Sequence, residues 1–144
     1  IEHLGAGRVA MGATTTGATL LGPGLVRPGG EGLVTLERRP GMAALAPLAA
    51  ALKSAGFKVR LSTDVRSMVW GKLVINAAIN PLTALLRVTN GELLTRPAAR
   101  RLMGELAAEA AAVARAEKVT LPFEDPQRAA EQVARRTAAN AAKA

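Results

Sequence analysis

The sequence predicts a short α/β region followed by an all-helical domain. Residues 1–61 combine β-branched runs and alternating apolar residues with glycine and proline, a pattern typical of strands and turns. Residues 62–144 carry apolar side chains mainly at helical spacing, which predicts helices. Because the composition changes between these parts, we place a domain boundary after Leu61.

Strands joined by turns are expected first. Residues 8–20 include Thr14-Thr15-Thr16, which predicts a strand because β-branched side chains favour an extended backbone. Gly22-Pro23-Gly24 ends this strand. The segment Pro28-Gly29-Gly30-Glu31-Gly32 is rich in turn residues. It predicts a hairpin turn between strands at residues 25–26 and 33–36.

One helix and one strand complete this region. Apolar residues recur at helical spacing between residues 45 and 52, and Gly56 follows them. A glycine in this place commonly ends a helix. Residues 57–61 alternate between apolar and basic side chains, which predicts a final strand.

The second region begins with a long helix. Ser62, Thr63 or Asp64 can cap its first turn. Pro81 is expected to end or kink it, because proline lacks an N–H and disfavours helical geometry at the preceding residue. Residues 89–91 read as a loop, from which Glu92 and Leu93 enter a helix.

Two further helices are expected after that loop. One runs from about Pro97 to Lys118, with Leu102, Leu106 and Val113 on its inner face. Asp125-Pro126 then has the pattern of an N-cap followed by proline at the first helical position. The last helix is expected to continue to the alanine-rich end of the chain.

Composition excludes several kinds of site. The 144 residues include no cysteine and a single histidine, His3, so thiolate and multi-histidine metal sites are ruled out and we expect no metal. No apolar run approaches the roughly 20 residues that span a bilayer, and no signal peptide is visible. We therefore expect a cytoplasmic protein without a membrane partner. Because the sequence starts at Ile1, we also expect a piece of a longer protein.

The formal net charge of +8 would suit nucleic acid or an anionic ligand. One tryptophan and two phenylalanines are too few for a base-stacking platform. The arginine pairs are spread along the chain, at residues 38–39, 100–101 and 135–136. A solvated surface is therefore favoured over nucleic-acid binding, while a phosphate-bearing cofactor could still benefit from the positive field.

Residues 69–81 form the most informative segment. They are apolar except for Lys72, Asn76 and Asn80, whose spacing of four stacks them along one side of a helix. A helix apolar almost all round is expected to be buried, and buried polar groups need hydrogen-bond partners. A small polar ligand would supply them.

Lys72 has two interpretations at this point. Its ammonium could polarise a carbonyl oxygen and donate a proton as charge develops there. Alternatively, its stem packs on the core while its amine reaches water. The two asparagines on the same stripe favour the first interpretation. No serine–histidine pair or carboxylate dyad is evident.

Motifs along the chain resemble those of ketopantoate reductases (2-dehydropantoate 2-reductases). The specific one is Lys-x3-Asn-x3-Asn-Pro-Leu-Thr-Ala, from Lys72 to Ala84. Asn90-Gly91-Glu92-Leu93-Leu94 also matches, and the glycine- and threonine-rich segments 12–18 and 30–32 match more weakly. The resemblance covers nearly the whole chain.

This resemblance implies an enzyme with a Rossmann cofactor domain and a helical substrate domain, which reduces 2-dehydropantoate to (R)-pantoate with NADPH in the route to pantothenate and coenzyme A. Lys72 matches the family's catalytic lysine. Asn76 and Asn80 match its substrate-binding asparagines, and Asn140 is a looser match to another. The implied partner is a small keto acid, and a homodimer is a further expectation.

The family's glycine fingerprint would precede Ile1. Residues 1–61 would then be an α/β remnant, the last strands of the Rossmann domain, and residues 62–144 most of the helical domain. Gly5-Ala6-Gly7 resembles the start of a fingerprint, but no third glycine follows at the required spacing, so a turn is favoured. The cofactor-binding residues stay unknown, and the chain alone is expected to be inactive.

Two other functions stay open. A related 2-keto acid reductase could use the same lysine on a different ketone. A basic helical interaction module would instead bind nucleic acid with an affinity that falls steeply with salt.

Overall fold

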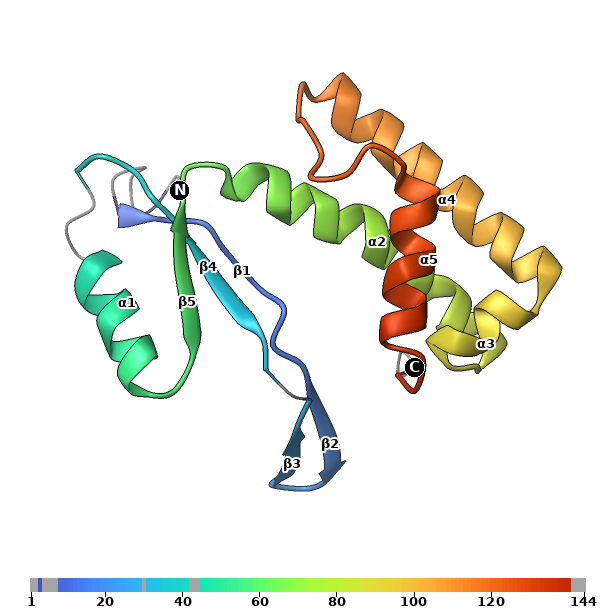
Figure 1. Ribbon diagram of the computed structural model, residues 1–144, viewed down its shortest axis with the longest axis horizontal. Helices are drawn as coiled ribbons and strands as arrows, with labels where there is room; N and C mark the ends of the chain where they lie inside the picture. The colour runs from blue at the N-terminus through green and yellow to red at the C-terminus, as the bar shows by residue number, and fades with distance from the viewer. Residues whose placement is uncertain (1–2, 4–7, 30, 42–44, 141–144) are drawn as a thin grey trace. The chain divides into compact units, whose positions relative to one another are not determined.

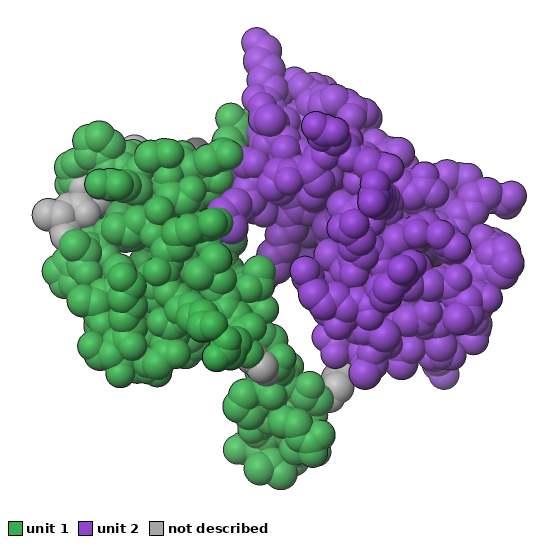
Figure 2. Space-filling model, viewed as in Figure 1, with its two compact units in different colours: residues 1–66 green, residues 67–144 purple. Residues whose placement is uncertain are grey.

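A computed structural model describes residue 3 and residues 8–29, 31–41 and 45–140 (Figure 1). The chain divides into two compact units, residues 1–66 and 67–144 (Figure 2). Gly5-Ala6-Gly7 and the alanine-rich end at 141–144 lie outside the described residues. The first unit contains the strands and the second is helical, so the predicted order of an α/β region before an all-α region is confirmed.

A three-stranded sheet organises the first unit. It contains β1 (Gly12–Thr14), β4 (Leu33–Glu37) and β5 (Lys58–Ser62), in the order β1-β4-β5. β1 is antiparallel to β4, and β4 is parallel to β5. The parallel pair needs a crossover connection, which α1 (Leu45–Ser54) supplies (Figure 1). Thr35 of the central strand is fully buried.

The hairpin of this unit differs from the prediction. β2 (Ala18–Gly22) pairs with β3 (Leu25–Pro28) across a turn at Pro23-Gly24, whereas β4 pairs with β1 and β5. Gly24 has a φ of 73°, which glycine adopts without steric cost. The expected hairpin between residues 25–26 and 33–36 is therefore wrong, because β3 pairs with β2 instead. The single strand over residues 8–20 is wrong too, because this region contributes to two strands, β1 and β2.

The strand and helix after this hairpin follow the prediction. α1 ends at Ser54, and Gly56 lies just beyond it with a φ of 87°. The N–H groups of Gly56 and Phe57 bond to the carbonyls of Lys53 and Leu52, which satisfies acceptors that the helix end leaves open. β5 (Lys58–Ser62) confirms the final strand, one residue later than the expected range of 57–61.

Four helices form the remainder: α2 (Val65–Leu86), α3 (Asn90–Thr95), α4 (Pro97–Ala116) and α5 (Pro126–Arg136) (Figure 1). Their core includes Leu93 and Met103, both fully buried. Asp125 caps α5 by accepting a hydrogen bond from the Arg128 N–H at 2.9 Å, and Pro126 occupies the first helical position. This cap confirms the prediction. The last helix nevertheless ends at Arg136 rather than continuing to the alanine-rich end.

The inner face of α4 is not the one expected. Leu102 and Val113 are exposed, and Leu106 is half-buried. The buried residues of α4 are mostly small: Ala99, Met103, Gly104, Ala107, Ala111 and Ala114. Small side chains let neighbouring helices approach closely, so choosing the larger apolar residues selects the wrong face.

Pro81 lies inside α2 and does not end it, because the helix continues to Leu86. In the described part of the chain, α2 is also long and apolar enough to cross a bilayer by length and composition alone, contrary to the expectation that no run approaches that length. A core helix of a soluble protein meets the same criteria. One face of α2 does enter the helical core, through Val74, Ile75, Ala78, Ile79 and Leu82.

Two helical glycines allow a matched test of close packing. A Cβ at Gly71 of α2 would lie 2.6 Å from Cγ of Pro122, whose ring cannot turn away. We expect Gly71→Ala to lose about 1–3 kcal/mol of unfolding free energy by overpacking, which outweighs the gain in helix propensity.

Gly104→Ala is the control in α4. Its Cβ would meet the end of the exposed, flexible Gln127 side chain at 2.7 Å. That side chain can move, so we expect a change between neutral and about 1 kcal/mol of stabilisation. Urea unfolding of both variants measures the difference, and equal effects would contradict the packing described here.

Candidate functional site

Lys72, Asn76 and Asn80 lie on one face of α2, as their spacing predicts, and all three are exposed. We call these three residues the α2 stripe. The expectation that they are buried is wrong. The residues that enter the helical core, among them Val74, Ile75 and Ala78, lie on the other side of the helix. The polar stripe therefore follows the solvent side of a helix that is buried on one face only.

The α2 stripe presents a cation followed by two carboxamides. A lysine ammonium offers three N–H donors, and each asparagine offers both donors and an acceptor. Such a set suits a small molecule with carboxylate, carbonyl and hydroxyl oxygens. Leu73 is exposed on the same helix, so the stripe also has an apolar neighbour.

Asn80 occupies a special position in the helix. It immediately precedes Pro81, which has no N–H to complete the helical hydrogen bond to the carbonyl of Ala77. The hydroxyl of Thr83 donates to the carbonyl oxygens of Ile79 at 3.2 Å and Asn80 at 3.0 Å. Side-chain bonding thus reinforces the backbone beside the proline.

Asn140 lies on the segment after α5 and not on α2. Its carbonyl accepts a hydrogen bond from the Asn90 N–H at 2.7 Å, and the carbonyl of Ala138 accepts from the Gly91 N–H at 3.0 Å. The Asn90 side chain also donates to the Thr137 hydroxyl at 2.8 Å. These bonds satisfy N–H groups at the start of α3 that have no partner within the helix, and they fix the backbone of residues 137–140.

The first turn of α3 confirms that Glu92 and Leu93 enter a helix, and it corrects the loop expected at residues 89–91. Asn90 and Gly91 belong to the helix rather than to a loop, and Thr89 is the N-cap. A carboxylate oxygen of Glu92 accepts from the Thr89 N–H at 2.8 Å, as a capping box requires. The Thr89 N–H and hydroxyl hold the pKa of Glu92 below its ordinary value.

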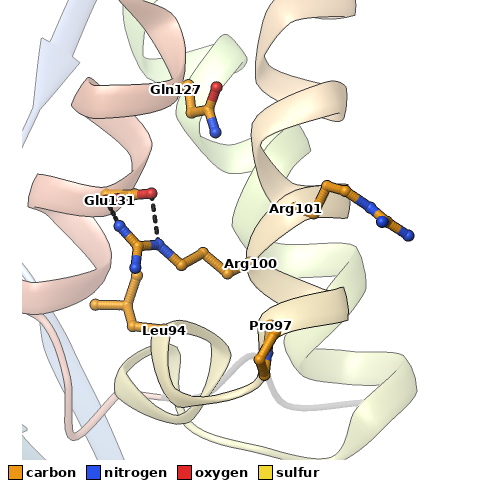
Figure 3. Close-up of a pocket in the computed structure, with 6 residues that line it drawn as sticks. All are labelled: Leu94, Pro97, Arg100, Arg101, Gln127 and Glu131. Atoms are coloured by element: carbon orange, nitrogen blue, oxygen red, sulfur yellow. Dashed lines mark hydrogen bonds and ion pairs between the residues drawn. The ribbon is translucent and has the colours of Figure 1, made fainter.

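An open hollow of about 350 Å³ lies among α3, α4 and α5 (Figure 3). Two bonds of 2.7 Å join the Arg100 guanidinium to the Glu131 carboxylate across it, whereas Arg101 points away. Its lining is Leu94, Pro97, Arg100, Arg101, Gln127 and Glu131. Because Glu131 already neutralises the Arg100 guanidinium, that cation is not open to an anionic ligand. We therefore assign the hollow no ligand.

A second open hollow of about 320 Å³ adjoins the start of α5. It is lined by Phe123, Glu124, Asp125, Arg128, Ala129 and Gln132. Neither hollow includes a residue of the α2 stripe or Asn140. Among the described residues there is no group of three histidine, cysteine, aspartate or glutamate side chains that could hold a metal.

The acidic partners in the helical unit predict a pH dependence. Hydrogen bonds from Arg100 lower the pKa of Glu131, and those from Thr89 lower that of Glu92. A carboxylate with a lowered folded pKa stabilises the fold above its unfolded pKa, and this contribution is lost as the pH falls through the folded value. We therefore expect the urea concentration at the midpoint of unfolding to decrease as the pH falls below about 4.5.

Glu131→Gln should weaken this acid dependence while lowering stability at neutral pH, because Arg100 loses its charged partner. If the urea midpoint of this variant changes with pH as it does in the wild type, Glu131 is not a source of the acid dependence. Glu124→Gln, at an exposed position beside α5, is the control.

The helical part matches a protein family, and one relative matches nearly the whole chain. The family described as "Ketopantoate reductase PanE/ApbA C terminal" matches residues 64–143. A 2-dehydropantoate 2-reductase of Halobacterium salinarum is 38% identical over 141 residues, which cover 96% of this chain and 46% of the relative. One from Bacillus subtilis is 60% identical over 42 residues, which cover 29% of this chain and 14% of the relative.

Solved structures resemble both units. A PanE/ApbA family ketopantoate reductase from Ralstonia eutropha has a TM-score of 0.79 at 32% identity, over 93% of this chain and 44% of that one. D-mandelate dehydrogenase in complex with NADH has a TM-score of 0.78 at 27% identity, over 91% of this chain and 45% of that one. The chain spans about half the length of the first relatives and structures it matches.

Proposed function

The chain belongs to the ketopantoate reductase family, and from this premise we propose that it supplies the substrate-binding and proton-donating half of an NADPH-dependent 2-dehydropantoate 2-reductase. The α2 stripe is the observation that carries this proposal. One cation and two carboxamides share an exposed helix face within the segment that matches the family. We refer below to the intact enzyme, meaning the polypeptide that joins these 144 residues to a dinucleotide-binding segment.

Lys72 is the proposed proton donor. Its ammonium donates a hydrogen bond to the substrate's keto oxygen and stabilises the negative charge that develops there as the carbonyl carbon is reduced. The ammonium then transfers a proton to the alkoxide, which gives the 2-hydroxy acid and a neutral amine. Solvent returns the proton to Lys72 before the next turnover.

Asn76 and Asn80 are the proposed substrate-binding residues. Asn76 lies one helical turn from Lys72, so its carboxamide can hold both the ammonium and the substrate in line. Asn80 lies one turn further and binds hydroxyl or carboxylate oxygens. Asn140 is a further proposed substrate ligand, since the bonds to the start of α3 fix the backbone on which it is placed.

Reduced nicotinamide supplies the hydride when it is bound. Among the described residues, no glycine-rich turn between a strand and a helix has the spacing that holds a pyrophosphate. The described part of the chain therefore does not fit the phosphate-binding role, and we assign it none. Residues 1–61 are the proposed end of the cofactor domain and residues 62–144 the substrate domain.

Steady-state oxidation of the nicotinamide cofactor by the intact enzyme tests this proposal. We expect turnover of NADPH with 2-dehydropantoate, and weaker use of NADH. Failure to consume either cofactor with any 2-keto acid, in a preparation that is folded, would overturn the proposal. The 144-residue chain on its own should be inactive. We also propose a cytoplasmic enzyme, and sedimentation would show whether it is a homodimer.

The neighbouring D-mandelate dehydrogenase structures favour a second candidate. They match this chain at 27% and 29% identity, so the same fold serves a different hydroxy acid. The intact enzyme would then prefer another 2-keto acid, such as the one formed by oxidising mandelate. Lys72 has the same role in both candidates, so a Lys72 variant cannot distinguish them. A panel of keto acids ranked by kcat/KM does distinguish them.

A further inference from the structure

We propose that Thr83 is a positioning residue for Asn80, and that its hydroxyl sets the geometry with which the α2 stripe binds substrate. This inference rests on the substrate role proposed above for Asn80. Thr83 is fully buried, so it does not touch a ligand itself. It would act through the backbone that carries Asn80.

Pro81 interrupts the helical hydrogen bonding of α2 directly after Asn80. The residue before a proline is disfavoured in helical geometry, because the proline ring crowds its backbone. That residue is Asn80, yet α2 continues through it to Leu86. Pro81 also removes one helical hydrogen bond on the N-terminal side. The carbonyl of Ala77, one turn before Pro81, therefore lacks its helical hydrogen bond, and α2 passes Asn80 without it.

The Thr83 hydroxyl bonds to the backbone directly beside Pro81. It lies 3.0 Å from the carbonyl oxygen of Asn80 and 3.2 Å from that of Ile79. One hydroxyl thus ties together the two residues immediately before the proline. Because the Asn80 side chain leaves the helix from this backbone, the bond holds the direction of its Cα–Cβ bond.

Burial strengthens this tie. Thr83 follows Asn80 by three residues and Asn76 by seven, so helical spacing places it on the side of the α2 stripe. It is nevertheless fully buried whereas the stripe is exposed. Water cannot compete for the hydroxyl, and the bonds to the carbonyls of Ile79 and Asn80 select one of the two χ1 rotamers that threonine adopts in a helix. The residue is therefore suited to hold a neighbour in place.

Thr83→Val in the intact enzyme is the test, because valine has the same shape but no hydroxyl. We expect KM for the keto acid to rise by about tenfold, the effect of one lost net hydrogen bond, with kcat changed less than twofold. Thr83→Ser retains the hydroxyl and should restore most of the lost affinity. A purely structural role would lower the melting temperature in both variants and leave KM unchanged, which would overturn the inference.

Two controls separate the possible failures. Thr95→Val removes a similar hydroxyl, which donates to the Glu92 carbonyl at 3.0 Å at an exposed position, and should leave KM unchanged. Asn80→Ala should raise KM, and adding Thr83→Val to it should have little further effect. If Asn80→Ala leaves KM unchanged, the proposed substrate role of Asn80 is wrong. If Asn80→Ala raises KM but Thr83→Val does not, only the positioning role fails.

Discussion

Replacing Lys72 with alanine should reduce kcat of the intact enzyme by about 10²–10³, a loss on the order of 2–4 kcal/mol of transition-state stabilisation. The reason is that the ammonium interacts most strongly with the alkoxide, which exists only as the reaction proceeds. KM should change by a smaller factor than kcat, because Asn76 and Asn80 still bind the substrate in its ground state. Lys72→Arg retains the charge but is a much weaker acid, so it should recover little activity.

Lys53→Ala is the matched control for this experiment. Lys53 is also an exposed lysine near the middle of the chain, but it lies in the last turn of α1. We expect its kcat and KM to equal those of the wild type. If kcat of Lys72→Ala lies within a few-fold of that of this control, Lys72 is not the proton donor and the α2 stripe only binds substrate.

Replacing Leu93 with alanine should produce the largest loss of stability. Leu93 is in the short helix α3, is fully buried and belongs to the core that includes residues of α2, α4 and α5. Truncation removes its apolar contacts and leaves a cavity, for which the typical cost is about 2–5 kcal/mol. Urea unfolding followed by circular dichroism measures this loss directly.

Leu102→Ala removes the same atoms from an exposed position in α4. Its cost should stay below about 1 kcal/mol, because 44% of the Leu102 surface is already exposed to water. A larger loss in Leu102→Ala than in Leu93→Ala would show that the sequence-predicted inner face of α4 is correct and that the packing described above is wrong.

Local signals in the sequence predicted the end of α1 and the start of α5 well. Asp125-Pro126 and Gly56 each act through their own backbone geometry, so neighbours in sequence suffice to identify them. The hairpin at Pro23-Gly24 was missed because two glycine-rich turns compete, and strand pairing decides between them only in the folded sheet. Local composition does not encode that choice.

The side chains of the helices show a second limit. Helical spacing placed Lys72, Asn76 and Asn80 on one face correctly, because the spacing is a property of the helix itself. Spacing does not predict whether another element packs on that face, and the three residues are exposed. The inner face of α4 was wrong for a related reason, since close packing selected alanine and glycine over larger side chains. Likewise, Arg100 and Glu131 are 31 residues apart, and no local pattern predicts their pairing.

The most direct measurement follows the side-chain amides of the α2 stripe by NMR while the intact enzyme is titrated with its keto acid. The proposed binding of the keto acid by the α2 stripe predicts saturable shifts of the Asn76 and Asn80 amide signals, with no comparable change at Gln127 in the hollow beside Arg100. Shifts confined to Gln127, with both stripe asparagines unmoved at saturating keto acid, would contradict it.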